Sequence, residues 1–280
     1  DDVKLTPTIA KLVEEDPTLH LEQNAELQEM VLWGQGDIHL QIAIDRLRNK
    51  YNLPVTARKP QVPYKETIRK GTAQHARFKR QSGGHGQFAD IQIEVRPLPR
   101  GTGHSFIDAV VGGAIPRNYI PAVEEGVMEF LRHGPLGFPV VDVSVTLITG
   151  QFHAVDSSDQ AFKTCARMAM SEAMPKCDPV LLEPVHHVDI SVPNAFTSRV
   201  QRVISGRRGQ ILGYDAKPGW DGWDVVAALL PQAELHDLIV ELRSVTLGVG
   251  TYTDGFDHLQ ELTGKLAERA MAGRGEQAAQ

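Results

Sequence analysis

Residues 141–162, VDVSVTLITGQFHAVDSSDQAF, join a predicted strand, a polar loop and a predicted helix. The apolar residues that alternate with polar ones in the strand are Val141, Val143, Val145 and Leu147. This period of two is typical of a strand with one buried face. The loop at residues 150–156 follows, and Ser157 or Ser158 then begins the helix as an N-cap. A strand and a capped helix on either side should hold the tip of this loop in a fixed position.

A second loop tip is predicted at residues 82–87, SGGHGQ, between a basic stretch at residues 69–80 and an alternating strand that begins near Ile91. Glycines let backbone N–H groups approach phosphates closely. Positive potential around these glycines would come from Arg77, Lys79, Arg80 and His85. The alternative is a hairpin bend that needs glycine only for its backbone torsions.

Length and composition narrow the class of protein. A chain of 280 residues is expected to form two or three domains, and 41% apolar with 23% charged residues indicates a globular protein. No run of about 18 apolar residues occurs, so no membrane span is predicted. The net charge of −6 means that any RNA contact must come from local basic patches.

The ends and the cysteines of the chain add two expectations. The sequence begins at Asp1 without an initiator Met or an apolar leader, so we expect a fragment or a processed piece. Cys165 and Cys177 are the only cysteines, which favours a reducing, cytoplasmic location and excludes a disulfide framework.

The periodicity predicts an α+β protein with two similar small units around a larger one. Residues 1–62 read helix, strand, strand, helix, strand, with a helix starting at Thr6-Pro7 and a strand at residues 55–62. That order is a ferredoxin-like split β-α-β unit whose first strand is missing. The middle unit spans residues 63–183.

Residues 184–262 read strand-helix-strand twice, again the split β-α-β pattern, with Gly206 available to cap the first helix. The tail at residues 263–280 is rich in Ala, Gly, Glu and Gln, and a frayed helix or disorder is expected there. Short linkers are predicted near residues 60–63 and 182–184.

Several motifs occur in one collinear order. They include GQGDIHL at 34–40, QSGGHGQF at 81–88, YIPAVEEG at 119–126, VDSS at 155–158, PVLLEP at 179–184 and RRGQILG at 207–213. Together with further pieces between residues 5 and 259, the sequence resembles the C-terminal half of elongation factor G, the ribosomal translocase. One such motif would be weak, whereas this many in order are specific.

The resemblance implies the domains called III, IV and V in that family, with ferredoxin-like ends and a ribosomal-protein-like α/β domain in the middle. It implies that the loop tips of the middle domain contact tRNA and mRNA in the decoding region, and that the last domain lies near the GTPase centre of the large subunit. The decoding-site residues would be Gly83, Gly84, His85, Gly86, Gln87, Gln151, His153 and Asp156. The rRNA contacts would be Arg77, Lys79, Arg80, Arg207 and Arg208.

The expected partners are the ribosome, with its rRNA, tRNA and mRNA, and the N-terminal GTPase domains of the same protein. No G-x-x-x-x-G-K-[ST] phosphate loop occurs in the sequence, so GTP and magnesium are expected in those domains and no cofactor is expected in this chain. We find no catalytic constellation and expect no enzyme activity from this chain alone. His186 and His187 would point to opposite faces of a strand, which excludes one shared metal site.

Departures from the family pattern indicate a divergent paralogue. His85 stands where the family usually has Arg or Lys, and LGVG at residues 247–250 replaces a more polar run. GTP-dependent translocation is the leading hypothesis, with ribosome recycling or tetracycline-type protection as alternatives inside the family. A protein-interaction module or an independent enzyme is the alternative from another class. For His153 the competing interpretation is a solvated loop residue.

Overall fold

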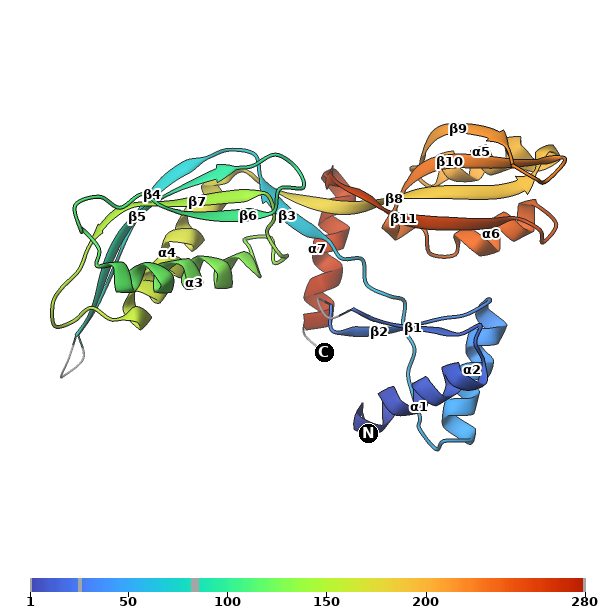
Figure 1. Cartoon of the computed structure of the whole chain (residues 1–280), viewed down its shortest axis with the longest axis horizontal. Coiled ribbons are helices and arrows are strands. Elements are labelled where there is room, and N and C mark those ends of the chain that lie inside the picture. The colour runs from blue at the N-terminus through green and yellow to red at the C-terminus, as the bar shows by residue number, and fades with distance from the viewer. Residues whose placement is uncertain (1, 25–26, 82–85, 279–280) are drawn as a thin grey trace. The chain divides into compact units, whose positions relative to one another are not determined.

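The computed structural model describes residues 2–24, 27–81 and 86–278, which form two compact units. One unit combines residues 1–63 with 188–253, and the other combines residues 64–187 with 254–280. The fold is α+β with several separate sheets, as the sequence predicts (Figure 1).

In residues 1–63 the helices and strands are α1 (Asp2–Glu15), β1 (His20–Asn24), β2 (Glu29–Trp33) and α2 (Asp37–Asn49). β1 and β2 form an antiparallel pair, and the two helices bury a small core against it, made of Ile9, Leu12, Leu19, Ala43 and Leu47. The helix expected to start at Thr6-Pro7 begins at Asp2 instead, with Pro7 in its second turn. Proline there removes only one hydrogen bond near the helix start, which limits its cost.

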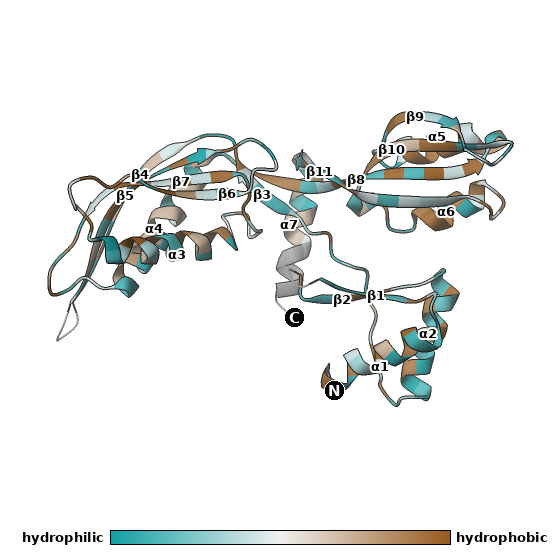
Figure 2. Cartoon of the chain, in the orientation of Figure 1, coloured by the Kyte–Doolittle hydropathy of each residue, from teal (hydrophilic) through white to brown (hydrophobic). Residues whose placement is uncertain are grey.

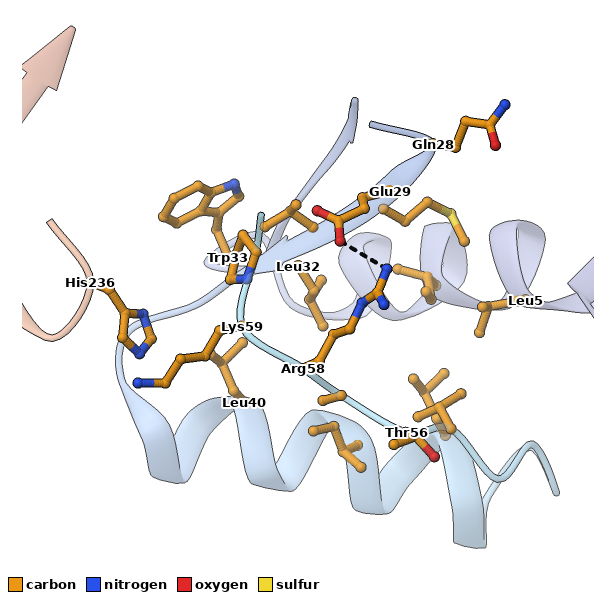
Figure 3. A pocket seen from close by; sticks show the side chains of 18 residues that line it. Leu5, Gln28, Glu29, Leu32, Trp33, Leu40, Thr56, Arg58, Lys59 and His236 are labelled. Atoms are coloured by element: carbon orange, nitrogen blue, oxygen red, sulfur yellow. Dashed lines mark hydrogen bonds and ion pairs between the residues drawn. The ribbon is translucent and has the colours of Figure 1, made fainter. Parts of the chain in front are cut away.

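The strand predicted at residues 55–62 does not form. In a split β-α-β sheet the last strand pairs with the first, and within the described residues no strand is available to pair with this segment. An open hollow of about 800 Å³ lies between β2 and residues 55–60 (Figure 3). The segment is held instead by Glu29, which accepts hydrogen bonds from Arg58 Nη2 and from the Gln61 amide, each at 3.0 Å.

The second unit contains a four-stranded sheet in the order β4-β5-β7-β6. Its strands are β4 (Thr72–Arg80), β5 (Gln87–Pro97), β6 (His104–Asp108) and β7 (Val143–Gln151). β4, β5 and β7 are antiparallel neighbours, and β6 runs parallel to β7. Two amphipathic helices, α3 (Ile120–Leu131) and α4 (Asp159–Ala173), pack with this sheet (Figure 2).

The core of this unit confirms the pattern from Val143 onward, whereas Val141 lies before β7 and Asp142, predicted on the polar face, is buried. Val143, Val145 and Leu147 are fully buried on one face of β7. The predicted inner face of α4 is buried too, and it consists of Phe162, Cys165, Ala166 and Ala169. Ser158 is the N-cap of α4 and accepts a hydrogen bond from the Ala161 amide at 3.2 Å. The 3-10 helices at Arg117–Tyr119 and Met174–Cys177 flank the two α-helices.

The remaining sheet has the order β11-β8-β10-β9, with β3 (Lys65–Ile68) paired to the beginning of β8. Its long strands are β8 (Pro179–Pro193), β9 (Gln210–Ala216), β10 (Trp223–Pro231) and β11 (Thr251–Leu262). The linker predicted near residues 182–184 lies inside β8. Pro184 is tolerated there because β3 pairs only with residues up to Leu182, so this position needs no donor to β3.

In residues 188–253 the helices are α5 (Thr197–Gly206) and α6 (Leu238–Val245), with 3-10 turns at Asn194–Phe196 and Gln232–Glu234. They bury an apolar cluster that includes Val188, Ile190 and Ile204. Gly206 does not cap α5 with a left-handed torsion, because that conformation falls on Arg208, with φ of 59°. The following Gly209 packs against Ile204, where a Cβ would lie 2.5 Å from a side-chain carbon.

The tail forms a helix, α7 (Gly264–Ala278), where a frayed helix or disorder was the prediction. Ala267, Ala270 and Met271 recur at helical spacing and pack with Phe138 and Leu181. This short apolar stripe explains why the tail is helical despite its Gly-rich and Gln-rich composition.

Candidate functional site

Those residues of the two predicted loops that the structure describes lie at one end of the β4-β5-β7 sheet. β4 ends at Arg80, β5 begins at Gln87 and β7 ends at Gln151, and the loop at residues 152–158 leads from β7 to α4. We call residues 77–80, 86–90 and 150–158 the tip. The tip therefore joins a hairpin end and a strand-to-helix loop on one sheet; the sequence predicts each of the two segments but not their meeting.

Asp156 and Ser157 contact the hairpin end directly. Asp156 Oδ1 accepts a hydrogen bond from the Gly86 amide at 3.0 Å, and the Asp156 carbonyl accepts one from the Phe88 amide at 2.8 Å. Ser157 Oγ donates to the Phe88 carbonyl at 2.8 Å and accepts from the His153 amide at 2.9 Å. These bonds use Asp156 inside the chain, although the resemblance implied a contact with tRNA or mRNA.

His153 has one ring nitrogen directed into its loop and a side chain that is 56% exposed. Nδ1 lies 3.3 Å from the Asp156 amide nitrogen, 3.4 Å from that of Val155 and 3.3 Å from Asp156 Oδ2. Neutral Nδ1 accepts from the amides, whereas protonated Nδ1 donates to the carboxylate. The ring also meets Phe88 edge-on at 6.3 Å. His153 therefore has a defined orientation together with an exposed surface.

A second polar cluster orders the base of the hairpin. Asp90 is buried and accepts hydrogen bonds from Arg77 Nε at 2.7 Å and His75 Nε2 at 2.9 Å. Arg77 Nη2 continues to Gln151 Oε1 at 3.2 Å, which links β4 to the end of β7. The arginine and glutamine predicted to contact RNA thus hold each other in place, while half of the Arg77 side chain remains exposed.

The other hairpin residues that are predicted to contact RNA are Lys79, Arg80 and residues 83–87. Lys79 and Arg80 are exposed at the end of β4 and form no ion pair with another residue in the described part of the chain. Gly86 and Gln87 are partly buried, and the Gly86 amide donates to the Asp156 carboxylate. Gly83, Gly84 and His85 lie outside the described residues.

Arg207 and Arg208 form hydrogen bonds with residues 234–241 of the same unit. Arg207 Nε donates to Glu241 Oε2 at 2.7 Å, and its Nη1 donates to the carbonyls of Glu234 and His236 at 2.7 and 2.9 Å. Arg208 Nε donates to Glu234 Oε1 at 2.9 Å. With its side chain only 17% exposed, Arg207 is used to fix the turn before α6, so the contacts favour a structural role over the predicted rRNA contact.

Arg207→Ala should lower the free energy of unfolding of this unit by about 1–3 kcal/mol, because two carbonyls and a carboxylate would lose a charged donor. Denaturant titration followed by the fluorescence of Trp220 and Trp223, with Trp33 replaced by Phe in both proteins, measures the change. Arg202→Ala on the exposed face of α5 is the matched control and should have almost no effect. Unchanged stability together with weaker ribosome binding would support the rRNA contact instead.

Other candidate sites are not assembled among the described residues. They contain no group of three His, Cys, Asp or Glu side chains that could hold a metal ion. His186 is paired with Asp254 at 2.7 Å, and burial raises the pKa of the Cys165 thiol to about 11. None of the helices that the structure describes has the length and apolar character of a membrane span.

Two of the tip contacts were missed by the sequence analysis. Asp90 was not singled out, although a hairpin that pairs Arg80 with Gln87 places it opposite Arg77, and that register could have revealed the pair. Ser157 was considered only as a possible N-cap. The signal for a second function was the presence of two consecutive serines where one cap is enough.

Comparisons with known proteins match each part of the chain. Family models described as elongation factor G domain III, domain IV and C-terminus match residues 1–59, 60–178 and 180–270. An "Elongation factor G-like protein" of Synechocystis sp. is 58% identical over 267 residues, which is 95% of this chain and 40% of that protein. A crystal structure of a Thermus thermophilus protein has a TM-score of 0.86 at 37% identity and covers 99% of this chain and 41% of the other. The chain thus spans about 40% of the length of these relatives.

Proposed function

We propose that this chain, which belongs to the elongation factor G family, moves tRNA and mRNA. Membership of the family supports a role like that of a translation elongation factor, with the ribosome as the general partner. In this proposal, GTP is bound with magnesium and hydrolysed in N-terminal domains of the same protein. The tip of this chain occupies the decoding site in the cytoplasmic ribosome.

The observation that supports this role is the exposed polar surface of the tip on a fixed support. Gln151 is the last residue of β7 and His153 follows it, and Val143, Val145 and Leu147 of this strand are fully buried. Histidine and glutamine can stack on bases or hydrogen-bond to their edges and to 2′-hydroxyl groups without a fixed sequence preference. A part that displaces many different tRNAs needs this kind of contact.

The mechanism in this proposal is mechanical, because the tip offers hydrogen-bond donors and acceptors but no activated nucleophile. The Cys165 thiol is buried and its pKa is raised, so it is not poised to react. The Asp90 carboxylate is occupied by hydrogen bonds from Arg77 and His75. The side chains of the tip would therefore act by contact alone in the decoding site, while GTP hydrolysis elsewhere supplies the free energy for displacement of tRNA and mRNA.

The test uses the full-length protein with ribosomes in three reactions. These are single-round displacement of tRNA and mRNA, splitting of post-termination ribosomes, and rescue of tetracycline-inhibited synthesis. GTP-dependent displacement is the expected result. Splitting without displacement would assign recycling, and rescue without displacement would assign protection. Activity in none of the three would leave a protein-interaction module as the better description.

Lys79→Ala with Arg80→Ala should make ribosome binding by the full-length protein less sensitive to salt. Each lost phosphate contact reduces the slope of log affinity against log salt by about 0.7–0.9. Arg96→Ala is the control, because Arg96 lies toward the opposite end of β5 and is paired with Glu94 at 2.7 Å. If the double variant keeps the wild-type slope, these residues do not contact phosphates.

A further inference from the structure

We propose that Asp156 and Ser157 are positioning residues that fasten the β4–β5 hairpin to the β7–α4 loop, so that the two parts of the tip act as one body. The inference deepens the proposed function, because it concerns the same site and rests on that function for its role on the ribosome. It assigns to Asp156 a role inside the chain in place of direct contact with RNA.

Asp156 and Ser157 connect the loop to the hairpin through side-chain groups and through a backbone group. In two of these hydrogen bonds a side chain of the loop binds the backbone of the hairpin. The Asp156 carboxylate accepts from the Gly86 amide, and the Ser157 hydroxyl donates to the Phe88 carbonyl. A third joins the Asp156 carbonyl to the Phe88 amide, so Phe88 has both its donor and its acceptor bound by the loop. The hairpin end is therefore held at two donors and one acceptor.

The close approach of the two segments is visible at Gly86. A Cβ on this residue would lie 3.0 Å from the Asp156 carboxylate carbon and from its Oδ1. Real Cβ atoms rarely approach other atoms so closely, so a larger residue would push the carboxylate away from the amide. The tight fit of Gly86 against Asp156 is thus explained inside the chain and needs no contact with phosphate.

The bonds of Ser157 are not needed to start α4. Ser158 already has the extended backbone of an N-cap, and its Oγ accepts from the Ala161 amide at 3.2 Å. Ser157 Oγ is directed to Phe88 and to the His153 amide instead. The two neighbouring serines thus separate two tasks, starting the helix and holding the hairpin.

Asp156 also connects this junction to the exposed residue of the loop. Its Oδ1 binds the hairpin amide, whereas Oδ2 lies 3.3 Å from His153 Nδ1. The groups that face this carboxylate are His153 from its own loop and the Gly86 amide from the hairpin. A displacement of the hairpin would therefore be transmitted to His153 through one side chain.

The experiment compares neighbouring residues in the full-length protein: Ser157→Ala with its control Ser158→Ala, and Asp156→Asn with its control Asp159→Asn. Hydrogen exchange of peptides covering residues 86–92 reports whether the hairpin end is held. The maximal rate of tRNA and mRNA displacement, and the protein concentration at half that rate, report the role on the ribosome.

Ser157→Ala should raise hydrogen exchange at the hairpin end about tenfold, because loss of the hydroxyl releases the Phe88 carbonyl from the loop. Asp156→Asn should raise it less, because the Asn side-chain oxygen can still accept from the Gly86 amide, but as a neutral acceptor. Both variants should lower the maximal displacement rate while the half-maximal concentration stays the same. Ser157→Thr, which keeps the hydroxyl, should restore both. Ser158→Ala should affect only the helix start, and Asp159→Asn should leave both readouts as in the wild type.

The inference would be overturned by unchanged exchange of residues 86–92 in Ser157→Ala, or by an equal increase in Ser158→Ala. A wild-type protein that displaces nothing, with exchange still raised in Ser157→Ala, would sink the proposed function while the junction itself stands. Raised exchange with a normal displacement rate would show that coupling of the two segments has no role in movement, and would also overturn the inference.

Discussion

The full-length protein with His153→Ala is expected to displace tRNA and mRNA on the order of 5- to 150-fold more slowly than the wild type. Stacking of a base on a ring contributes about 1–3 kcal/mol by alanine substitution, and that free energy converts to this range of rates. The ring is more than half exposed, and its orientation is set by the loop amides and by Phe88. Single-round displacement on pre-translocation ribosomes measures the effect.

A change at His153 could also act through the shape of the loop, and His153→Asn separates the two causes. The Asn side-chain oxygen can accept from the same loop amides as Nδ1, but the variant has no ring to stack. The slow rate should therefore persist in His153→Asn, and His104→Ala, at an exposed position on β6, should behave like the wild type. A normal rate for His153→Asn would mean that the histidine only shapes its loop.

Gly150→Ala should produce the largest loss of stability among the substitutions considered, about 3 kcal/mol, as expected when a packed backbone has no room to move. A Cβ at Gly150 would lie 2.1 Å from the Asp90 carbonyl oxygen and 2.7 Å from Ile115 Cδ1. β5 would have to move away from β7 at the pair Ile91 and Gly150, next to the residue that binds Arg77 and His75. The denaturant midpoint of this chain measures the loss.

Gly213→Ala is the matched control for that substitution. Gly213 also lies in a strand, β9, but nothing is found within 4 Å of the position that its Cβ would occupy. Its expected change is within about 1 kcal/mol. If Gly150→Ala unfolds at the wild-type midpoint, the spacing of β5 and β7 adjusts more easily than their packing indicates.

The parts of the fold that sequence reasoning predicted well are those in which local pattern and tertiary packing agree. The alternation before Gly150 and the serine before α4 gave the strand, the loop and the capped helix, because one face of each element is fully buried. His153 could be placed in an exposed loop for the same reason. Its contact with RNA stays a prediction, because residues that bind a partner at the surface have no regular spacing in the sequence.

The misplaced elements depend on partners far away in the chain. Residues 55–62 have the composition of a strand, but a strand also needs a neighbour to accept its hydrogen bonds. Pro184 reads as a break, yet β8 continues because its pairing with β3 ends before that residue. Arg207 belongs to a basic motif, and only the tertiary structure shows that its donors are used by Glu241 and two carbonyls.

The burial of both native thiols has a practical consequence. Cys165 and Cys177 are fully enclosed, and burial raises the pKa of each, so maleimide dyes should leave them unmodified. A cysteine introduced by Gln151→Cys would then be the single labelling position of this chain. A fluorophore there could report the arrival of the tip at its target in real time, without prior removal of any natural cysteine.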